Sequence, residues 1–115
     1  MATVLIVDDD SGTLKLACFI LEQSGQVVLS ASNGVEALIA FTSYHSRLDV
    51  VLTDVNMPEM GGIELAARIH AMDPSKRIVL MTGSILEEVP EYCTMLSKPF
   101  RPDDLIAAVQ GVLKV

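Results

Sequence analysis

Cysteine is scarce in this sequence of 115 residues, which contains only Cys18 and Cys93. The two residues lie far apart, form no CxxC pair and have no histidine close to them in the sequence. This spacing excludes the usual patterns of a zinc knot and of a disulfide scaffold. We therefore expect a protein of the reducing cytoplasm.

Long hydrophobic runs and basic residues are also lacking. The longest unbroken apolar run, residues 16–21, has six residues, whereas a membrane span needs about 20 and a signal peptide needs a basic start. Eight basic residues against 15 acidic ones give a formal net charge of −7. Because that charge would repel a phosphate backbone, we expect no nucleic-acid binding by this domain and no membrane insertion.

The chain is long enough for one domain, residues 1–115, and too short for two. Apolar residues make up 50 % of it and charged residues 20 %, a balance that favours a folded core over disorder. Short apolar runs without polar alternation are typical of strands that are buried on both faces. Five such runs are present, at residues 3–7, 26–31, 49–53, 77–81 and 92–97.

Stretches of helical periodicity separate these runs. In the first, apolar residues recur at i, i+3, i+4 and i+7, which predicts a helix that ends at Gly25. Further helices are predicted to begin at Asn33, after Gly62 and at about Pro102. The alternation of strands and helices predicts an α/β fold in which a parallel sheet is covered by helices on both faces.

The connection between the fourth and fifth predicted strands is short. Fifteen residues separate Thr82 from Lys98, and the strand takes about five or six of them. The remaining segment, residues 84–91, contains Pro90 near its end, so any helix there has at most about two turns. We therefore expect a shortened fourth helix.

Polar residues follow four of the five predicted strands. They are Asp8, Asp9 and Asp10 after the first strand, Asp54 after the third, Thr82 after the fourth, and Ser97 and Lys98 at the fifth. The carboxyl ends of parallel strands open on one edge of a sheet, where ligands bind. Carboxylates crowded at that edge cannot all stay ionised without a cation, and Mg²⁺ prefers hard oxygen ligands.

A phosphoryl group on Asp54 would find the metal, the Lys98 ammonium and the Thr82 hydroxyl around its oxygens, as phosphoryl transfer requires. Each residue taken alone also has an ordinary structural interpretation: a helix cap for the first acidic run, a turn residue for Asp54, a solvated side chain for Lys98. The functional interpretation depends on four strand ends that carry compatible groups.

Four motifs in this order resemble the receiver domain of two-component response regulators. They are VLIVDDD, VVLTDVNMPEMGGIEL, VLMTG and SKPF, and they extend over almost the whole chain. The resemblance implies a three-layer, flavodoxin-like (CheY-like) fold with a doubly wound, five-stranded parallel sheet in the order 2-1-3-4-5.

The resemblance also implies the acceptor and the metal site. Asp54 corresponds to the phosphoacceptor, Asp9 to a direct Mg²⁺ ligand, and Asp8 to a companion acid that acts through water. The backbone carbonyl of Asn56 corresponds to a third protein ligand. We expect Mn²⁺ to be able to replace Mg²⁺ at this site.

Thr82 and Lys98 correspond to the residues that respond to the phosphoryl group. Thr82 matches a hydroxyl that moves onto the group, Lys98 matches the residue that contacts it, and the Lys98–Pro99 peptide matches one that is typically cis. The aromatic switch residue three positions before the lysine is Met95 in this sequence. Together with the shortened fourth helix, Met95 predicts an altered output surface.

The sequence therefore predicts a phosphoacceptor that takes a phosphoryl group from a sensor histidine kinase or a histidine phosphotransfer protein and signals through an unidentified partner or relay. It is expected to catalyse only its own phosphorylation and dephosphorylation. Whether it is a standalone regulator or the receiver module of a hybrid histidine kinase stays open. The alternatives are a receiver-like interaction module that is not phosphorylated and, more remotely, a small Mg²⁺-dependent phosphatase.

Overall fold

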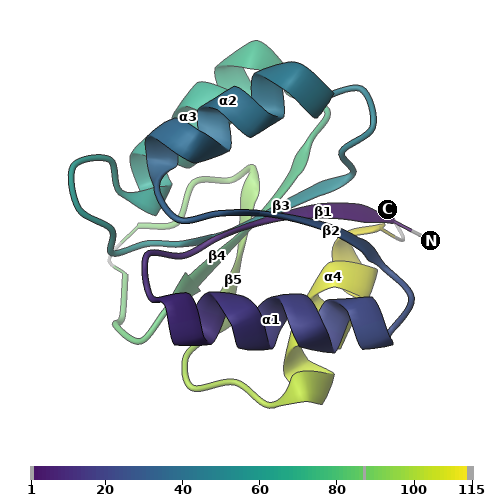
Figure 1. Ribbon diagram of the computed structural model, residues 1–115. Coiled ribbons are helices and arrows are strands. Elements are labelled where there is room, and N and C mark those ends of the chain that lie inside the picture. Colours follow the sequence, from purple (N-terminus) through teal and green to yellow (C-terminus); the bar gives the residue numbers. More distant parts are fainter. Residues whose placement is uncertain (1, 87, 114–115) are drawn as a thin grey trace.

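A parallel sheet between two layers of helices forms the domain in the computed structural model, which describes residues 2–86 and 88–113 (Figure 1). The strands are β1 (Thr3–Val7), β2 (Val27–Ala31), β3 (Val50–Asp54), β4 (Arg77–Thr82) and β5 (Cys93–Ser97). Their order is β2-β1-β3-β4-β5, and every neighbouring pair is parallel. The predicted fold class and strand order are confirmed.

Four helices cover the two faces of the sheet. They are α1 (Ser11–Gln23), α2 (Gly34–Tyr44), α3 (Gly62–Met72) and α4 (Pro102–Leu113). Figure 1 shows α1 and α4 on one face and α2 and α3 on the other. Within the described residues the longest helix, α1, has 13 residues, and no helix there is long and apolar enough to cross a bilayer.

The alternation of side chains along each central strand divides the core into two halves. On β1, Leu5 packs into the cluster beneath α2 and α3, whereas Ile6 packs into the cluster beneath α1 and α4. β3 is buried along its whole length. Strands covered on both faces need apolar residues at every position, which is why their sequences show no polar alternation.

Side-chain caps fix the starts of the first two helices. Asp10 accepts a hydrogen bond from the Thr13 amide, and Asn33 accepts one from the Glu36 amide. The Glu36 carboxylate reaches back to the amide and hydroxyl of Ser32, which completes an arrangement close to a capping box. The Asp10 cap places the start of α1 directly beside the acidic run.

The connection between β4 and β5 differs from the sequence prediction. Its described residues, 83–86 and 88–92, form no helix, whereas a shortened fourth helix was expected, so the label α4 in Figure 1 belongs to the last helix of the chain. The segment is shorter than a stable helix with two flanking turns requires, and Pro90 removes one amide donor from it. Leu86 and Tyr92 instead pack against the core beneath α2 and α3.

The strand ends also differ slightly from the predicted bounds. β3 and β4 each extend one residue further than predicted and include Asp54 and Thr82. Gln26, Asp49 and Tyr92 lie outside the strands. The Gln26 and Asp49 side chains accept hydrogen bonds from the amides of residues 2 and 3 at the start of β1. Both side chains therefore connect neighbouring strands at the amino-terminal edge of the sheet.

Gly62 is required by a close approach between α3 and the end of β3. A Cβ atom at this position would lie 2.1 Å from the backbone oxygen of Asp54. We expect Gly62→Ala to lower the free energy of unfolding by roughly 1–3 kcal/mol, as overpacking does. The measurement is urea unfolding followed by circular dichroism.

Gly111 supplies the matched control, because a Cβ atom there meets nothing within 4 Å and the residue lies within α4. Gly111→Ala is expected to raise the free energy of unfolding by about 0.5–1 kcal/mol through helix propensity. Equal effects of the two substitutions would contradict the close approach at Gly62.

Candidate functional site

Three carboxylates meet where β1 and β3 end side by side. Asp8 and Asp9 follow β1, and Asp54 is the last residue of the adjacent β3. Each offers an oxygen atom, and these oxygens all lie within 4.8 Å of one another. Asp8 is fully buried, Asp54 is 7 % exposed and Asp9 is exposed. The sequence prediction that these three residues converge is confirmed by this geometry.

Lys98 is the cation of this cluster. It follows β5, and its peptide bond to Pro99 is cis, as expected. Its Nζ atom lies 3.0 Å from Oδ2 of Asp8 and 3.2 Å from Oδ1 of Asp54. One ammonium therefore bridges two of the three carboxylates, which leaves an excess of negative charge that a divalent cation would balance.

The surroundings of Asp54 disfavour its charged form. Burial raises the pKa of its carboxyl, and the negative charges of Asp8 and Asp9 act in the same direction. The hydrogen bond and the charge of Lys98 lower the pKa of Asp54, but the net direction is upward. A carboxylate in this position gains from any further positive charge, whether an ion or a second ammonium group.

The surroundings of Lys98, in contrast, favour its charged form. Burial alone would lower the pKa of its ammonium, but the hydrogen bonds and charges of Asp8 and Asp54 outweigh burial and raise it. Lys98 therefore keeps its charge throughout the physiological range. The cluster has a permanent positive charge aimed at the Asp54 oxygen.

Thr82 ends β4 next to this cluster, and only 1 % of it is exposed. Its hydroxyl oxygen accepts a hydrogen bond of 3.0 Å from the Ser84 amide and lies 3.4 Å from the Ser84 carbonyl oxygen. The hydroxyl thus holds the first residues of the β4–β5 connection. Sequence reasoning did not foresee this link, because a threonine two residues before a serine is not a specific pattern.

The remaining predicted residues lie at the edge of the site. Asn56 is exposed in the loop after β3, two residues beyond Asp54. Met95 lies in β5, pairs in register with Leu80 and is half-buried against the core beneath α2 and α3. A methionine there fills core space, so position 95 supplies no aromatic ring that could move with Thr82.

Two hollows of different character flank the carboxylates. On one side, Thr13, Leu16, Gly83, Lys98, Pro99 and Phe100 line a largely apolar hollow. On the other side, Asp9, Ser32, Asn33, Val35, Glu36, Pro58 and Glu59 line a more polar hollow with three acidic side chains. A molecule that approaches Asp54 therefore meets apolar surface on one side and negative charge on the other.

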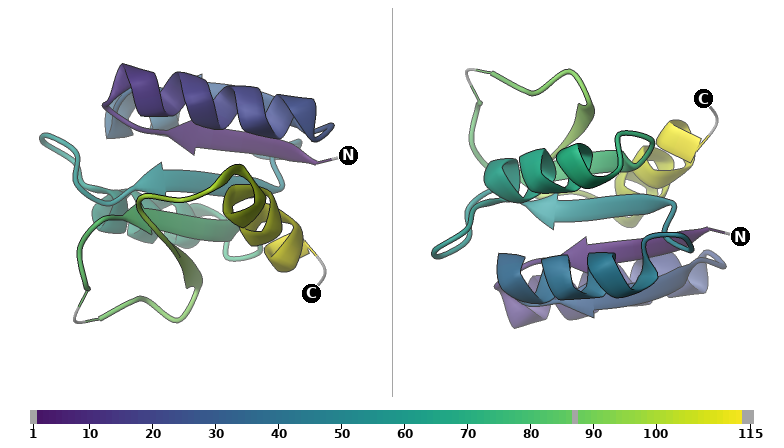
Figure 2. Two further views of the ribbon diagram at one scale, coloured as in Figure 1. Left: turned by 90° about the horizontal axis from the view of Figure 1, so that it is seen from below. Right: turned by 90° about the horizontal axis from the view of Figure 1, so that it is seen from above.

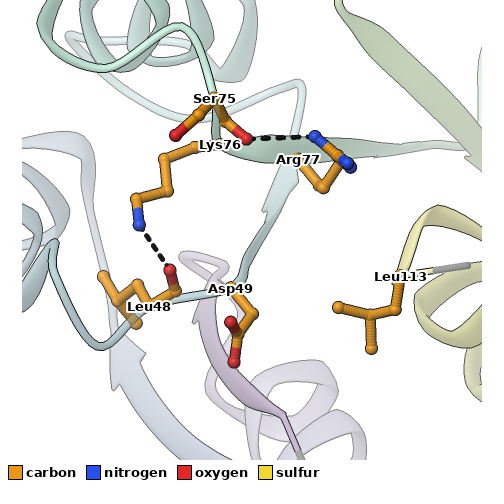
Figure 3. A pocket seen from close by; sticks show the side chains of 6 residues that line it. All are labelled: Leu48, Asp49, Ser75, Lys76, Arg77 and Leu113. Atoms are coloured by element: carbon orange, nitrogen blue, oxygen red, sulfur yellow. Dashed lines mark hydrogen bonds between the residues drawn. The ribbon is translucent and has the colours of Figure 1, made fainter. Parts of the chain in front are cut away.

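A separate pocket lies at the amino-terminal edge of the sheet, away from this site (Figure 3). Its basic side chains have partners: Lys76 donates to the Leu48 carbonyl, and Arg77 donates to the carbonyls of Ser75 and Val112. Asp49, which also lines it, accepts from the backbone at the start of β1. These bonds hold β1, β3, β4 and α4 together. The polar side chains that line this pocket therefore have a structural role.

The comparison with protein families identifies the family of this domain. The family model described as the response regulator receiver domain matches residues 4–110. The chain belongs to this family. The chain is therefore a receiver domain of two-component systems, and its acidic cluster lies at the carboxyl edge of the sheet.

The curated relatives differ in length, and some are much longer than this receiver domain. The chain is 34 % identical over 119 residues to the transcriptional regulatory protein GlrR of Escherichia coli, with 98 % of the chain and 26 % of the relative covered. It therefore spans about a quarter of that relative. It is 34 % identical over 116 residues to the sporulation initiation phosphotransferase F of Bacillus subtilis, with 96 % of the chain and 92 % of the relative covered.

Solved structures superpose closely on the receiver domain. A response regulator receiver domain protein from Clostridium thermocellum matches with a TM-score of 0.93 at 30 % identity, over 99 % of this chain and 95 % of that one. The CheX-CheY-BeF3-Mg complex from Borrelia burgdorferi matches with a TM-score of 0.90 at 27 % identity, over 97 % and 89 %. The second of these structures is a complex that contains Mg²⁺ and BeF3.

The raised pKa of Asp54 leads to a pH-dependent stability difference. Because proton binding is favoured in the folded state, the stability that Asp54 contributes is full below the ordinary carboxyl pKa of 3.8 and is lost as the pH rises through its folded pKa. In the absence of divalent cations, we expect Asp54→Asn to unfold at higher urea concentration than the wild type at pH 7, and this advantage to vanish below pH 3.8.

Glu88→Gln is the control for this measurement, because it removes one negative charge from an exposed position. It is expected to change the urea midpoint at pH 7 by less than Asp54→Asn does. A decrease in stability on Asp54→Asn at pH 7 would show that the ion pair with Lys98 outweighs burial.

Proposed function

We propose that this receiver domain accepts a phosphoryl group on Asp54 from a phosphohistidine of a sensor histidine kinase or of a histidine phosphotransfer protein. The observation that carries the proposal is the Asp54 carboxylate itself. It lies at the open end of β3, is 7 % exposed, and has the Lys98 ammonium 3.2 Å from its Oδ1. A nucleophilic oxygen beside a fixed positive charge meets the main electrostatic requirement of phosphoryl transfer.

In the transfer step, a carboxylate oxygen of Asp54 forms a bond to phosphorus while the bond between phosphorus and the donor's imidazole nitrogen breaks. The electron pair of the broken bond stays on the imidazole. Lys98 is near enough to transfer its hydrogen bond from the carboxylate to the phosphoryl oxygens. Hydrolysis by water later returns the Asp54 carboxylate and inorganic phosphate, so the domain turns over only its own phosphoryl group.

The residues present fit Mg²⁺. Asp9 and Asp54 would bind it through carboxylate oxygens and Asn56 through its backbone carbonyl, while the buried Asp8 would act through water; Mn²⁺, with similar hard ligands, would take the same place. When bound, the ion supplies positive charge for the phosphoryl oxygens. Asp8 already has another task, because it holds Lys98 through a 3.0 Å ion pair and accepts from the Asp10 amide.

We further propose that the domain acts in the cytoplasm, where ATP-dependent histidine kinases keep their phosphohistidines, and that its signal passes to a protein partner. The acidic net charge of −7 supports a protein partner over nucleic acid. An interaction module without phosphorylation is the second candidate, and Met95 at the switch position favours it. The two candidates differ in one chemical property, the labelling of Asp54.

Acetyl phosphate labelling tests the transfer chemistry. With Mg²⁺ present, we expect one phosphoryl adduct in the intact mass, mapped to Asp54, and none after EDTA treatment. Asp54→Asn should abolish the adduct. Lys98→Ala should still be labelled, because Lys98 is not the nucleophile, but should lose the conformational response to labelling.

Two results would contradict the proposal. Labelling of Asp54→Asn at the wild-type level would place the acceptor elsewhere. The absence of any adduct, under conditions in which a control receiver domain is labelled, would favour the interaction module.

Binding of Mg²⁺ should stabilise the fold, because the ion binds a site that the unfolded chain lacks. At a Mg²⁺ concentration 100 times its dissociation constant, the expected gain is about 2.7 kcal/mol in the free energy of unfolding. Thermal unfolding with increasing Mg²⁺ measures it. Asp9→Asn should greatly reduce the gain, whereas Asp103→Asn, an exposed carboxylate in the first turn of α4, should leave it unchanged.

A further inference from the structure

The helix layer formed by α2 and α3 exposes apolar side chains on its outer side. On α2, Val35 is 53 % exposed and Ile39 is 63 % exposed. The two helices are neighbours in the fold, and the right view of Figure 2 shows both on the side of the sheet nearest the viewer, with α1 behind the sheet. Exposed apolar side chains that gather on one face are typical of an interaction surface.

The exposed side of α3 combines small and charged residues. Glu64, Ala67, Arg68 and Ala71 are all exposed and recur at i, i+3, i+4 and i+7, so they share one face of the helix. Glu64 and Arg68 form an ion pair of 2.8 Å, in which each side chain is more than half exposed. Since the pair has one charge of each sign, α3 adds no net charge to this face.

We call this surface the α2–α3 face and define it by its exposed outer residues, Val35, Ile39, Glu64, Ala67, Arg68 and Ala71. It differs in charge from the rest of the molecule, which has a formal net charge of −7. The small alanines would let a second helix approach α3 closely.

The charges at the α2–α3 face are arranged along the helix direction. Glu36 and Glu64 lie in the first turns of α2 and α3. Arg68 lies further along α3, and the exposed Arg47 follows α2. Both helices run in the same direction, because each returns the chain between two parallel strands. One end of the face is therefore negative and the other end is positive.

A second copy of the chain fits this arrangement. A two-fold axis perpendicular to the face places each α3 antiparallel to its copy, so the negative end of one face meets the positive end of the other. Two-fold interfaces of this kind use the same surface on both subunits. A uniformly acidic or basic partner would instead be repelled at one of the two ends.

The overall charge and the size of the face limit the strength of such an association. Repulsion between two chains of net charge −7 is screened over about 8 Å at physiological salt. Helices of 11 residues are about 16 Å long and about 10 Å wide. A face of two such helices is smaller than the roughly 800 Å² that each partner buries in a stable complex. A dimer formed through it is therefore weak and reversible.

We propose that the α2–α3 face is the interface of a weak, two-fold symmetric homodimer in which Glu64 of each copy pairs with Arg68 of the other. Ala67 lies between the two charged positions, where the two α3 helices cross. The inference is independent of the phosphoryl transfer proposed above, because none of the residues that define the face belongs to the acidic cluster.

Sedimentation equilibrium of the whole domain tests the association, without a phosphodonor and at about 0.15 M salt. As the protein concentration rises to about 1 mM, the average mass of the wild type is expected to move from that of a monomer towards that of a dimer. Arg68→Glu should raise the dimer dissociation constant at least about tenfold, because it places like charges opposite each other.

Lys15→Glu is the matched control for Arg68→Glu, because it changes the net charge equally at an exposed position of α1, on the opposite side of the sheet. It is expected to raise the dissociation constant much less. Circular dichroism should show that both variants remain folded, since both side chains lie at the surface.

Charge exchange tests the pairing itself. The double variant Glu64→Arg, Arg68→Glu has the net charge of the wild type and should regain the wild-type dissociation constant. Glu64→Arg alone should associate as weakly as Arg68→Glu alone. A mixture of these two single variants should form a heterodimer, because the two arginines of one then face the two glutamates of the other.

Two isoleucine variants test the apolar part of the face. Ile39→Ser should weaken the dimer several-fold through the loss of an apolar contact. Ile85→Ser is the control, because Ile85 is 97 % exposed and lies outside the α2–α3 face. It should leave the dissociation constant unchanged.

The proposal is overturned if the wild type stays monomeric up to about 1 mM or forms oligomers larger than a dimer. It is also overturned if Arg68→Glu acts no more strongly than Lys15→Glu, if the mixture of single variants stays monomeric, or if Ile85→Ser weakens the dimer as much as Ile39→Ser does. None of these results depends on labelling of Asp54. Failure of the dimer is therefore distinguishable from failure of the phosphoacceptor.

Discussion

The crowding of three carboxylates around one ammonium is the constraint on which the rest of this structure depends. Asp8 is fully buried and Asp54 nearly so, and such groups are unfavourable unless a charge or a hydrogen bond compensates them. Lys98 provides that compensation from a third strand end, through contacts of 3.0 and 3.2 Å. The charge of Lys98 compensates part of the negative charge, so that the carboxylates can be buried. The excess of negative charge that remains suits a cation.

The parallel sheet makes this crowding possible. Because β1 lies next to β3, their carboxyl ends deliver Asp8 and Asp54 to the same point, and β4 and β5 deliver Thr82 and Lys98 beside them. The close approach of α3 at Gly62 to the Asp54 carbonyl then fixes the end of β3. This edge of the sheet is therefore tightly packed where it holds Asp54.

The same edge of the sheet is irregular after β4. The connection after β4 contains no helix in its described residues, Met95 replaces an aromatic switch residue, and Thr82 binds the backbone of Ser84. The Thr82 hydroxyl therefore contacts the start of the connection between β4 and β5. Ile85, Glu88 and Glu91 are exposed on this connection.

The fold class, the strand order (through family resemblance) and the residues of the acidic cluster could all be predicted from the sequence. It could do so because strands buried on both faces leave uninterrupted apolar runs, and because Asp8, Asp9 and Asp54 follow those runs directly. The Lys98–Pro99 cis peptide also followed from the resemblance. Local patterns of this kind depend only on residues close together in the chain.

The pairing of the charges and the conformation of the short connection could be learned only from the folded structure. The bond between Lys98 and Asp8 joins residues 90 positions apart, and no local pattern indicates which of several carboxylates an ammonium will contact. The predicted shortened helix is missing from the described residues 83–86 and 88–92, because packing of Leu86 and Tyr92 on the core outweighs the weak helical tendency of a short, proline-containing segment. Ion pairing and core packing at long range are properties of the assembled fold.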